Sequence, residues 1–251
     1  MADDKNKKGL NTNANSYTII YAAILVVVVA FLLAFVSRSL KPMQDSNVAL
    51  DKKKQILASL NIRGLSDEQS AQRYAEVVLA DDILDSATGE TTQTGTQGGE
   101  DNGFTLTSTD MKAGRLALFR CSVNGETKYV VPLYGMGLWG SISGYIAIND
   151  DKNTVFGAYF NHESETAGLG AEIKDSQEWQ EQFQGKKITV DGVDGVALCV
   201  LKKNLVKDPQ TQCDAVTGAT LTCNGVSDML RDCLGRYSAF LNLKEEKEDN
   251  K

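Results

Sequence analysis

The chain has 251 residues, of which 42% are hydrophobic and 24% are charged, as in one globular domain of ordinary size with attached segments. Its net charge of −7 argues against nucleic acid as a partner, because a nucleic-acid-binding protein needs a basic face. There is a single histidine, His162, which excludes a multi-histidine zinc site. No two of the five cysteines are spaced C-x-x-C, so no metal site is expected, and we expect most of them to be small buried side chains.

The first distinctive segment is an uncharged run of 20 residues, YTIIYAAILVVVVAFLLAFV, at positions 17–36. As a helix it would measure about 30 Å, the thickness of the hydrocarbon core of a bilayer. A cleaved signal peptide is the alternative, but its apolar region usually has about 7–15 residues. We therefore predict an N-terminal tail over residues 1–16 and a transmembrane helix over 17–36. Counting the flanking lysines and arginines slightly favours a cytoplasmic main domain, but long domains often ignore that rule, so the orientation stays open.

Residues 37–85 are expected to be a helical segment. Ser66 and Gln69 fit a capping box, which predicts a helix running through Tyr74, Val77 and Val78. The lysine run at 52–54 favours a solvated helix face over a lipid-binding site. Residues 86–103 are polar and low in complexity, so they predict a mobile loop.

The pattern then changes to short strands separated by glycine and asparagine. The predicted strands cover residues 115–123, 128–134, 140–148, 153–160, 186–190 and 195–201. A final helix, beginning between residues 220 and 224, follows from apolar residues spaced three and four apart, namely Val226, Leu230, Cys233, Leu234, Tyr237 and Leu241. Residues 104–243 should thus form an α+β domain, a twisted, mostly antiparallel sheet with flanking helices, followed by a charged tail at 244–251.

The helix start carries the sequence DAVTGATLTC, at positions 214–223, with hydroxyls at Thr217, Thr220 and Thr222. A helix N-terminus offers unpaired N–H groups and the positive end of the dipole, so it favours an anion such as phosphate. Gly218 and Ala219 would leave the approach to such a site open. The simplest interpretation, however, is that Thr220 or Thr222 is an N-cap, and the residues alone leave both open.

Two other stretches are rich in glycine. In HESETAGLG, at 162–170, Gly168 and Gly170 allow a positive φ and a close approach of the backbone to a flat ring, although a plain glycine turn is the alternative. In PLYGMGLWG, at 132–140, Trp139 suits a contact with a ring or a place in the core at a strand end. This loop lacks the lysine of a P-loop and the spacing of a dinucleotide fingerprint.

These stretches resemble known motifs. Asp214–Thr220 is similar to the flavinylation motif Asp-Gly/Ala-x-Ser/Thr-Gly-Ala-Thr of membrane electron-transport subunits, and 162–170 resembles His-x-x-Glu-Thr-Pro-Gly-Leu-Gly, with Ala167 in place of proline. With the N-terminal anchor and the Gly-Leu-Trp-Gly loop, the order resembles the C-subunit family of sodium-pumping NADH:quinone oxidoreductases over nearly the whole chain. The G subunit of the Rnf electron-transport complex is the nearest alternative.

The resemblance implies FMN joined through its phosphate to the hydroxyl of Thr220. It places the rest of the flavin site at Asp214, Thr217, Gly218, Ala219, Thr222, Trp139, Glu165, Thr166, Gly168, Leu169 and Gly170. Glu165, Thr166 and backbone N–H groups would bond the pyrimidine edge of the flavin.

The family's function is a one-electron relay, in which the flavin carries the redox chemistry and the chain has no catalytic residues of its own. The resemblance implies electrons arriving from an iron–sulfur centre of the membrane subunits and leaving to a covalent FMN on the B subunit, in a complex that couples oxidation of NADH by a ubiquinone-type quinone to Na⁺ export. It also implies attachment of FMN by a separate flavin transferase. The chain would be single-pass in the bacterial inner membrane, with its N-terminus cytoplasmic and its main domain periplasmic.

Two other classes of function remain as alternatives. One is a membrane-anchored binding or scaffold module without a cofactor, in which the threonines are caps and the glycines are turns. The other is a hydrolase, which is poorly supported because Ser141 and Ser143 lie in GSISG rather than in a Gly-x-Ser-x-Gly elbow, and His162 would have to be the base.

Overall fold

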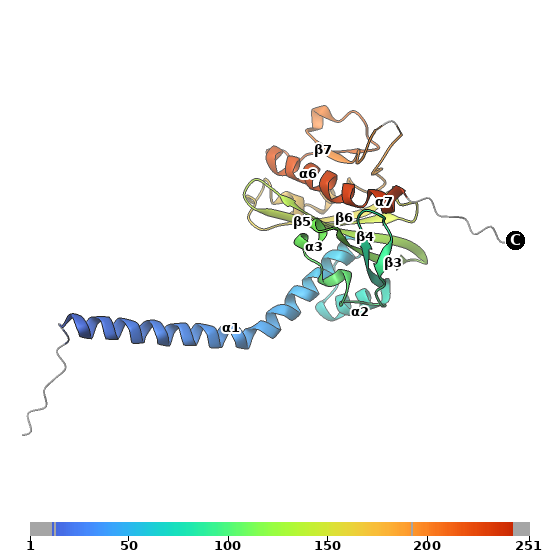
Figure 1. Cartoon of the computed structure of the whole chain (residues 1–251). Helices are drawn as coiled ribbons and strands as arrows, with labels where there is room; N and C mark the ends of the chain where they lie inside the picture. The colour runs from blue at the N-terminus through green and yellow to red at the C-terminus, as the bar shows by residue number, and fades with distance from the viewer. Residues whose placement is uncertain (1–11, 13, 192, 243–251) are drawn as a thin grey trace, which may run out of the picture. The chain divides into compact units, whose positions relative to one another are not determined.

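The structure, a computed structural model, describes residues 12, 14–191 and 193–242 (Figure 1). The chain divides into two compact units, Met1–Ala49 and Leu50–Lys251. The first unit is represented by most of α1 (Asn15–Ser59), which has Pro42 inside it. Among the described residues, α1 is the one helix long and apolar enough to cross a membrane, and it contains the predicted span 17–36.

The second unit is built around an antiparallel sheet with the strand order β2-β1-β3-β4-β5-β6. Its strands are β1 (Val78–Asp85), β2 (Thr91–Gln93), β3 (Arg115–Val123), β4 (Glu126–Met136), β5 (Ser141–Asn149) and β6 (Val155–His162). A separate parallel pair joins β7 (Cys199–Leu201) to β8 (Gln212–Asp214). The helices are α2 (Asp67–Val77), α3 (Ser108–Lys112), α4 (Glu172–Asp175), α5 (Gln177–Glu181), α6 (Thr220–Arg236) and α7 (Ser238–Asn242), with short 3₁₀ turns at Gly103–Thr105 and Lys203–Leu205. This arrangement confirms the predicted mostly antiparallel sheet with flanking helices.

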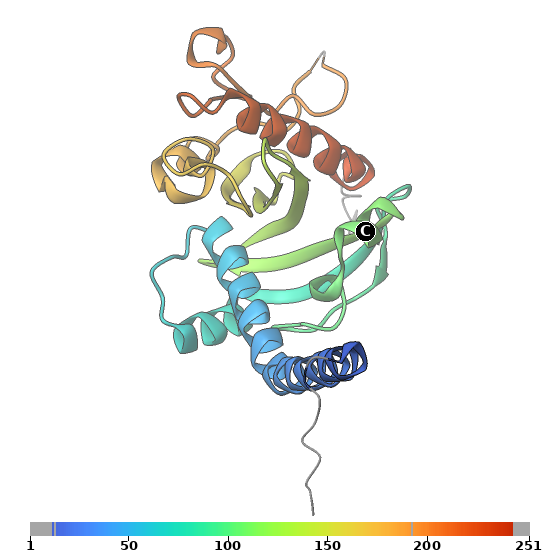
Figure 2. The same cartoon turned by 90° about the vertical axis from the view of Figure 1, so that its left-hand side faces the viewer.

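Helices cover both faces of the sheet, with α6 on one face and α2 on the other (Figures 1 and 2). Side chains alternate along the strands, so each central strand supplies two apolar faces. Leu116 and Leu118 of β3 belong to the core cluster that contains Val226 and Leu230 of α6. Phe119, the next residue along the strand, faces the other way and packs edge-on against Phe104.

The hairpin between β3 and β4 follows from its turn residues. Asn124 and Gly125 both have positive φ, at 54° and 83°, as a two-residue turn of the Asn-Gly type requires. The turn fixes the register in which Phe119 pairs with Val130. It thereby also fixes which face of β4 meets α6.

The helix expected through Val78 ends one residue earlier, at Val77, with the predicted capping box of Ser66 and Gln69 at its start. Residues 78–85 form β1 instead, where Asp81 and Asp82 are both buried. The carboxylate of Asp81 accepts a hydrogen bond from the Asn102 N–H at 2.8 Å, so partners distant in sequence stabilise an acidic pair inside the sheet. The local sequence pattern does not predict this buried acidic pair.

Residues 86–103, predicted to be a mobile loop, contain the short strand β2. The segment is tied down by the buried pair, since Asp82 also accepts from the Gly95 N–H at 2.8 Å. The run 186–190 does not form a strand and contributes one isolated bridge, between Lys187 and Thr154. There the backbone bonds to single residues of different segments, such as Asn153 and Gln210, rather than to a continuous strand edge.

The lysine run 52–54 is not a solvated face. Lys53 pairs with Glu100 at 2.6 Å and Lys54 with Asp67 at 2.5 Å, while the Lys52 ammonium donates to the Phe104 carbonyl. The three lysines therefore hold the last turns of α1 against the rest of the second unit, to which they belong. All five cysteines are free thiols and four of them are buried, which confirms the expectation for most of them.

Candidate functional site

The start of α6 has no side-chain cap. Ala219 occupies the N-cap position, and the Cys223 N–H makes the first helical bond, to the Ala219 carbonyl, at 3.0 Å. The N–H groups of the three residues before Cys223 therefore lie at the open end of the helix. Because Ala219 is the N-cap, the interpretation of Thr220 or Thr222 as a cap is wrong.

A cleft of about 140 Å³ lies at this open end. Three segments form it: the loop after β4, the loop after β6 and the first turn of α6. The residues that line it are Leu138, Glu165, Thr166, Leu169, Gly170, Gly218, Ala219, Thr220, Leu221 and Thr222. Ligand pockets usually measure about 300–1,000 Å³, so this cleft fits one part of a cofactor while the rest lies over its rim.

The three threonines of the motif have different surroundings. Thr217 is exposed and does not line the cleft, whereas Thr220 is half-buried and lines it. Thr222 is 1% exposed, and its hydroxyl donates to the Glu165 carboxylate at 2.6 Å. Only Thr220 combines access, a place in the cleft and a position at the open helix end.

Glu165 joins the three segments. One carboxylate oxygen accepts the Thr222 hydroxyl, and the other accepts the Trp139 N–H at 2.9 Å. Burial raises the pKa of Glu165, but the hydrogen bonds from Thr222 and from the backbone of Trp139, Gly140 and Leu138 outweigh it, so the pKa lies below its usual value. Glu165 is therefore a carboxylate at neutral pH, although it is only 8% exposed.

Two glycines make room for this carboxylate. A Cβ on Gly137 would lie 2.4 Å from one Glu165 oxygen, and a Cβ on Gly170 would lie 2.5 Å from the other. Gly218 has φ +82° and packs against Leu169, whose Cδ2 would lie 2.8 Å from an added Cβ. The sequence predicted that Gly170 lets the backbone approach a flat ring, whereas in the structure it makes room for the side chains of Glu165 and Thr222.

The rim of the cleft is apolar. Trp139 is 67% exposed and Leu221 is 59% exposed, with Leu138 and Leu169 beside them also open to solvent. Exposed apolar side chains grouped around a cleft indicate a binding surface. An anionic group at the helix start and a flat apolar ring over the rim would both find suitable contacts, so the residues present fit an FMN.

The structure brings most of the predicted site residues into this one cleft. Four of them do not line it: Asp214, Thr217, Gly168 and Trp139. Asp214 ends β8, where its carbonyl accepts the Trp179 indole N–H at 2.7 Å. Leu138 and Leu221 were not predicted, although both lie inside the motifs, where an apolar residue between glycines or hydroxyls was the only signal.

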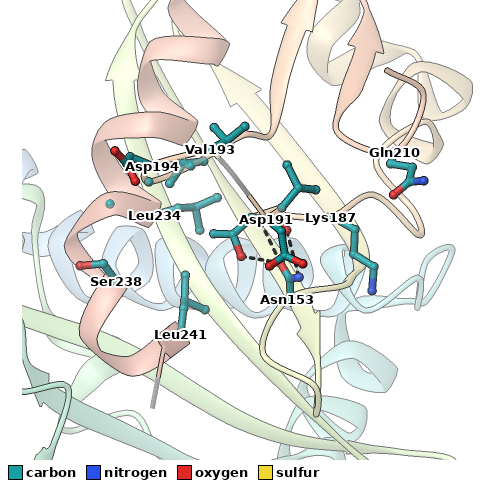
Figure 3. Close-up of a pocket in the computed structure, with 14 residues that line it drawn as sticks. Asn153, Lys187, Asp191, Val193, Asp194, Gln210, Leu234, Ser238 and Leu241 are labelled. Carbon is teal, nitrogen blue, oxygen red and sulfur yellow. Dashed lines mark hydrogen bonds between the residues drawn. The ribbon is translucent and has the colours of Figure 1, made fainter. Parts of the chain in front are cut away.

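A larger cavity of about 800 Å³ lies elsewhere, between the C-terminal end of α6 and residues 187–191 and 193–196 (Figure 3). Figure 3 shows Asn153, Lys187 and Asp191 on one side of it and Leu234 and Leu241 on the other. None of the predicted site residues lines it. Size alone therefore does not identify the functional site, and the motif residues point to the smaller cleft.

Comparison with known proteins agrees with the site. Residues 137–235, which contain the whole cleft, match the FMN-binding domain family. The chain is 28% identical to the C subunit of the Na(+)-translocating NADH-quinone reductase of Haemophilus ducreyi, over 90% of this chain and 91% of that one.

Two solved structures are similar. The crystal structure of the C subunit of the Na(+)-translocating NADH-quinone reductase from Parabacteroides distasonis is 33% identical, with a TM-score of 0.73 over 82% of this chain and 98% of that chain. The crystal structure of NqrC from Shewanella oneidensis is 23% identical, with a TM-score of 0.63 over 78% of this chain and 97% of that chain, and supports the fold alone. Because it is 33% identical to a solved C subunit over 82% of this chain and 98% of that chain, and because residues 137–235 match the FMN-binding domain family, this chain belongs to the C-subunit family of Na(+)-translocating NADH-quinone reductases.

Proposed function

We propose that this chain carries FMN as a phosphoester on Thr220 and relays single electrons within a Na⁺-translocating NADH-quinone reductase. The observation that carries the proposal is the half-buried Thr220 hydroxyl in the cleft at the uncapped start of α6. A phosphate there would accept charge-assisted hydrogen bonds from the free N–H groups, which are roughly twice as strong as neutral ones. FMN, when bound, supplies the electron transfer, and the chain supplies binding and orientation.

The other two hydroxyls are less suited to attachment. Thr222 already donates to Glu165 inside the protein. Thr217 is exposed and lies outside the cleft, so a phosphate on it would remain in water. The family motif selects the same residue, Thr220.

The isoalloxazine ring would lie over the apolar rim formed by Leu138, Trp139, Leu169 and Leu221. Its face would cover side chains that are otherwise open to solvent, which stabilises the bound state by about 25 cal/mol per Å² of apolar surface. Thr166 and the backbone N–H groups of the 166–170 loop remain candidates for its polar edge. Glu165 is the poorer candidate, because its two oxygens accept from Trp139 and Thr222 and the side chain is only 8% exposed.

The wider setting is also a proposal, supported by the names of the relatives. The apolar run 17–36 of α1 would be a single membrane span in the bacterial inner membrane, with the N-terminus cytoplasmic and the flavin domain, 104–243, periplasmic. The partners would be a flavin transferase, the iron–sulfur membrane subunits as electron donors and the B subunit as acceptor, in a complex that exports Na⁺. The relatives named as C subunits favour this assignment over the G subunit of the Rnf complex and over a scaffold module.

The test is peptide mapping and intact mass of the full chain purified from cells that contain a flavin transferase. We expect one FMN on the peptide with Thr220, and a band on a denaturing gel that fluoresces in the wild type and in Thr217→Val but not in Thr220→Val. FMN found on Thr217 or Thr222, or a fluorescent Thr220→Val band, would refute the attachment site. A wild-type chain of unmodified mass would refute the covalent flavin altogether.

A further inference from the structure

Glu165 connects elements that are far apart in sequence. Trp139, which donates to one carboxylate oxygen, lies 26 residues earlier, and Thr222, which donates to the other, lies 57 residues later. Its own N–H donates to Nδ1 of His162 at 3.2 Å, which holds the loop after β6 in place. Through these two acceptor oxygens, one side chain connects all three segments that form the cleft.

We infer that Glu165 is a positioning residue: it holds the loop after β4 against the first turn of α6 and so sets the shape of the cleft, instead of binding the flavin itself. The inference rests on the proposed flavin site. The two glycines at 137 and 170 support it, because each leaves the space that a carboxylate oxygen of Glu165 occupies. Enclosed in this way, the carboxylate of Glu165 faces its protein donors and has little room to turn toward a ligand.

The inference assigns a role to Thr222 as well. Its hydroxyl is buried and has Glu165 as its acceptor, so it serves as the donor that joins α6 to Glu165. This explains a second threonine two positions after Thr220 without a second attachment site. Thr222→Ser keeps the donor, whereas Thr222→Val removes it with little change of volume.

Glu165 also places a fixed negative charge in the wall of the cleft. Its carboxylate is satisfied by neutral donors of the protein, and no cation lies among its hydrogen-bond partners in the described part of the chain. A negative charge close to a redox group opposes the addition of an electron to that group, and does so more strongly where water is excluded. Glu165 should therefore make a flavin in this cleft harder to reduce.

The first experiment needs no flavin. The full chain is purified in detergent from cells that do not attach FMN, with the absence of fluorescence confirmed on a denaturing gel, and hydrogen exchange is measured. We expect the amides of Leu138, Trp139 and Gly140 to exchange about tenfold faster or more in Glu165→Gln and in Thr222→Val. Thr222→Ser should restore slow exchange, and Glu163→Gln, an exposed neighbour on the same loop, should change nothing.

A double-mutant cycle in the same flavin-free chain measures the coupling between Glu165 and Thr222. If Glu165 and Thr222 act together, the double variant Glu165→Gln/Thr222→Val should lower the folding equilibrium constant by much less than the product of the two single effects. Independent effects, or unchanged exchange at residues 138–140 in Glu165→Gln, would overturn the positioning role.

The second experiment uses the flavin-loaded chain and a redox titration. Glu165→Gln should shift the flavin midpoint to a more positive potential, so that at the wild-type midpoint the variant is about tenfold more reduced than oxidised. Glu163→Gln should shift it much less, because that side chain is exposed and screened. A Glu165→Gln midpoint equal to that of the wild type would contradict the charge effect. If the chain carries no flavin at all, the proposed function fails, while the flavin-free experiment still decides the role of Glu165.

Discussion

Gly168 and Gly170 look equivalent in the sequence but have different roles in the structure. Gly168 has φ +73° and nothing within 4 Å of an added Cβ, so it serves only the turn. Gly170 lines the cleft, where an added Cβ would also lie 2.6 Å from the Thr222 hydroxyl. The sequence could predict that the loop needs glycines, but only the packing separates these two reasons.

Matched alanine substitutions should distinguish the roles of Gly168 and Gly170. Gly168→Ala should lower the free energy of unfolding by about 1–2 kcal/mol, the cost of a left-handed conformation, and leave the flavin spectrum unchanged. Gly170→Ala should cost about 1–3 kcal/mol through overpacking and also shift the flavin absorption, because it displaces Glu165 or Thr222. Urea unfolding and visible absorption measure both quantities. A spectral shift in Gly168→Ala but not in Gly170→Ala would show that the loop lies differently.

Lys52 gives a prediction for pH. Burial lowers its pKa to about 8, against a smaller opposing effect from Asp81. Between pH 8 and 10.5 the unfolded chain binds more protons at this residue, so its contribution to stability increases as the pH rises through that range. The unfolding free energy of the wild type relative to Lys52→Met should therefore increase between about pH 7 and 10, by on the order of 1–3 kcal/mol. Denaturant titrations at several pH values measure this difference, and a difference that stays constant would mean that Lys52 is solvated.

At the scale of elements, alternation and turn residues predicted β3, β4, β5 and β6 well, because each is long and its hairpin turns carry asparagine or glycine. β1 could not be predicted, since an acidic pair in an apolar run indicates a surface helix unless its partners are known. Those partners, Gly95 and Asn102, lie in a segment whose composition suggests no structure at all. Tertiary contacts decide the structure in both places.

In the site, too, local features could be predicted from the sequence and long-range contacts could not. The motifs predicted which residues gather at the start of α6, because a helix N-terminus after a glycine turn is a local feature. They could not predict that Glu165 faces the protein rather than the cofactor. Its donors lie 26 and 57 residues away, in the loop after β4 and in α6, and no local pattern predicts that contact.

The pair β7–β8 packs on α6 through the apolar core, and the Ser227 hydroxyl of α6 adds hydrogen bonds to the β7 backbone. Ser227 Oγ accepts the Val200 N–H at 2.9 Å and lies 2.9 Å from the Val200 carbonyl, to which it can donate. Ser227→Ala would leave a buried N–H without its acceptor, so the free energy of unfolding should fall by about 1–3 kcal/mol. β8 leads directly into the motif that starts at Asp214, and flavin attachment should therefore become less complete.

The control for this prediction is Asp228→Ala, the next residue of α6, which is exposed and pairs only with Arg231 at 3.0 Å. An exposed pair of this kind contributes little, about 0.3–0.5 kcal/mol. Unfolding in urea and fluorescence of the denatured chain give the two measurements. Equal stability of Ser227→Ala and Asp228→Ala would mean that the β7 backbone finds another partner.

At the scale of the whole molecule, α1 belongs to both compact units. Its apolar run 17–36 lies in the first, while Ile56 and Leu57 near its end, and Leu60 just after it, are buried in the second. The sequence predicted a membrane span over 17–36 followed by a helical segment over 37–85. The helix α1 covers the span and the first part of that segment, and its last turns are part of the core.

Two truncations should separate these two parts of α1. A chain of residues 38–251 lacks the apolar run but keeps the three core residues, so it should be soluble without detergent and fold with the cooperativity of the second unit. A chain of residues 62–251 loses Ile56, Leu57 and Leu60, each of which is at most 1% exposed and contributes about 1.5–3 kcal/mol by its burial. The total, about 5–9 kcal/mol, is comparable with the whole stability of a typical domain, so the shorter chain should be largely unfolded.

Gel filtration in buffer without detergent and near-ultraviolet circular dichroism distinguish the outcomes. If 38–251 still required detergent, apolar surface outside residues 17–36 would have to bind the membrane; if 62–251 folded as well as 38–251, the last turns of α1 would not belong to the core.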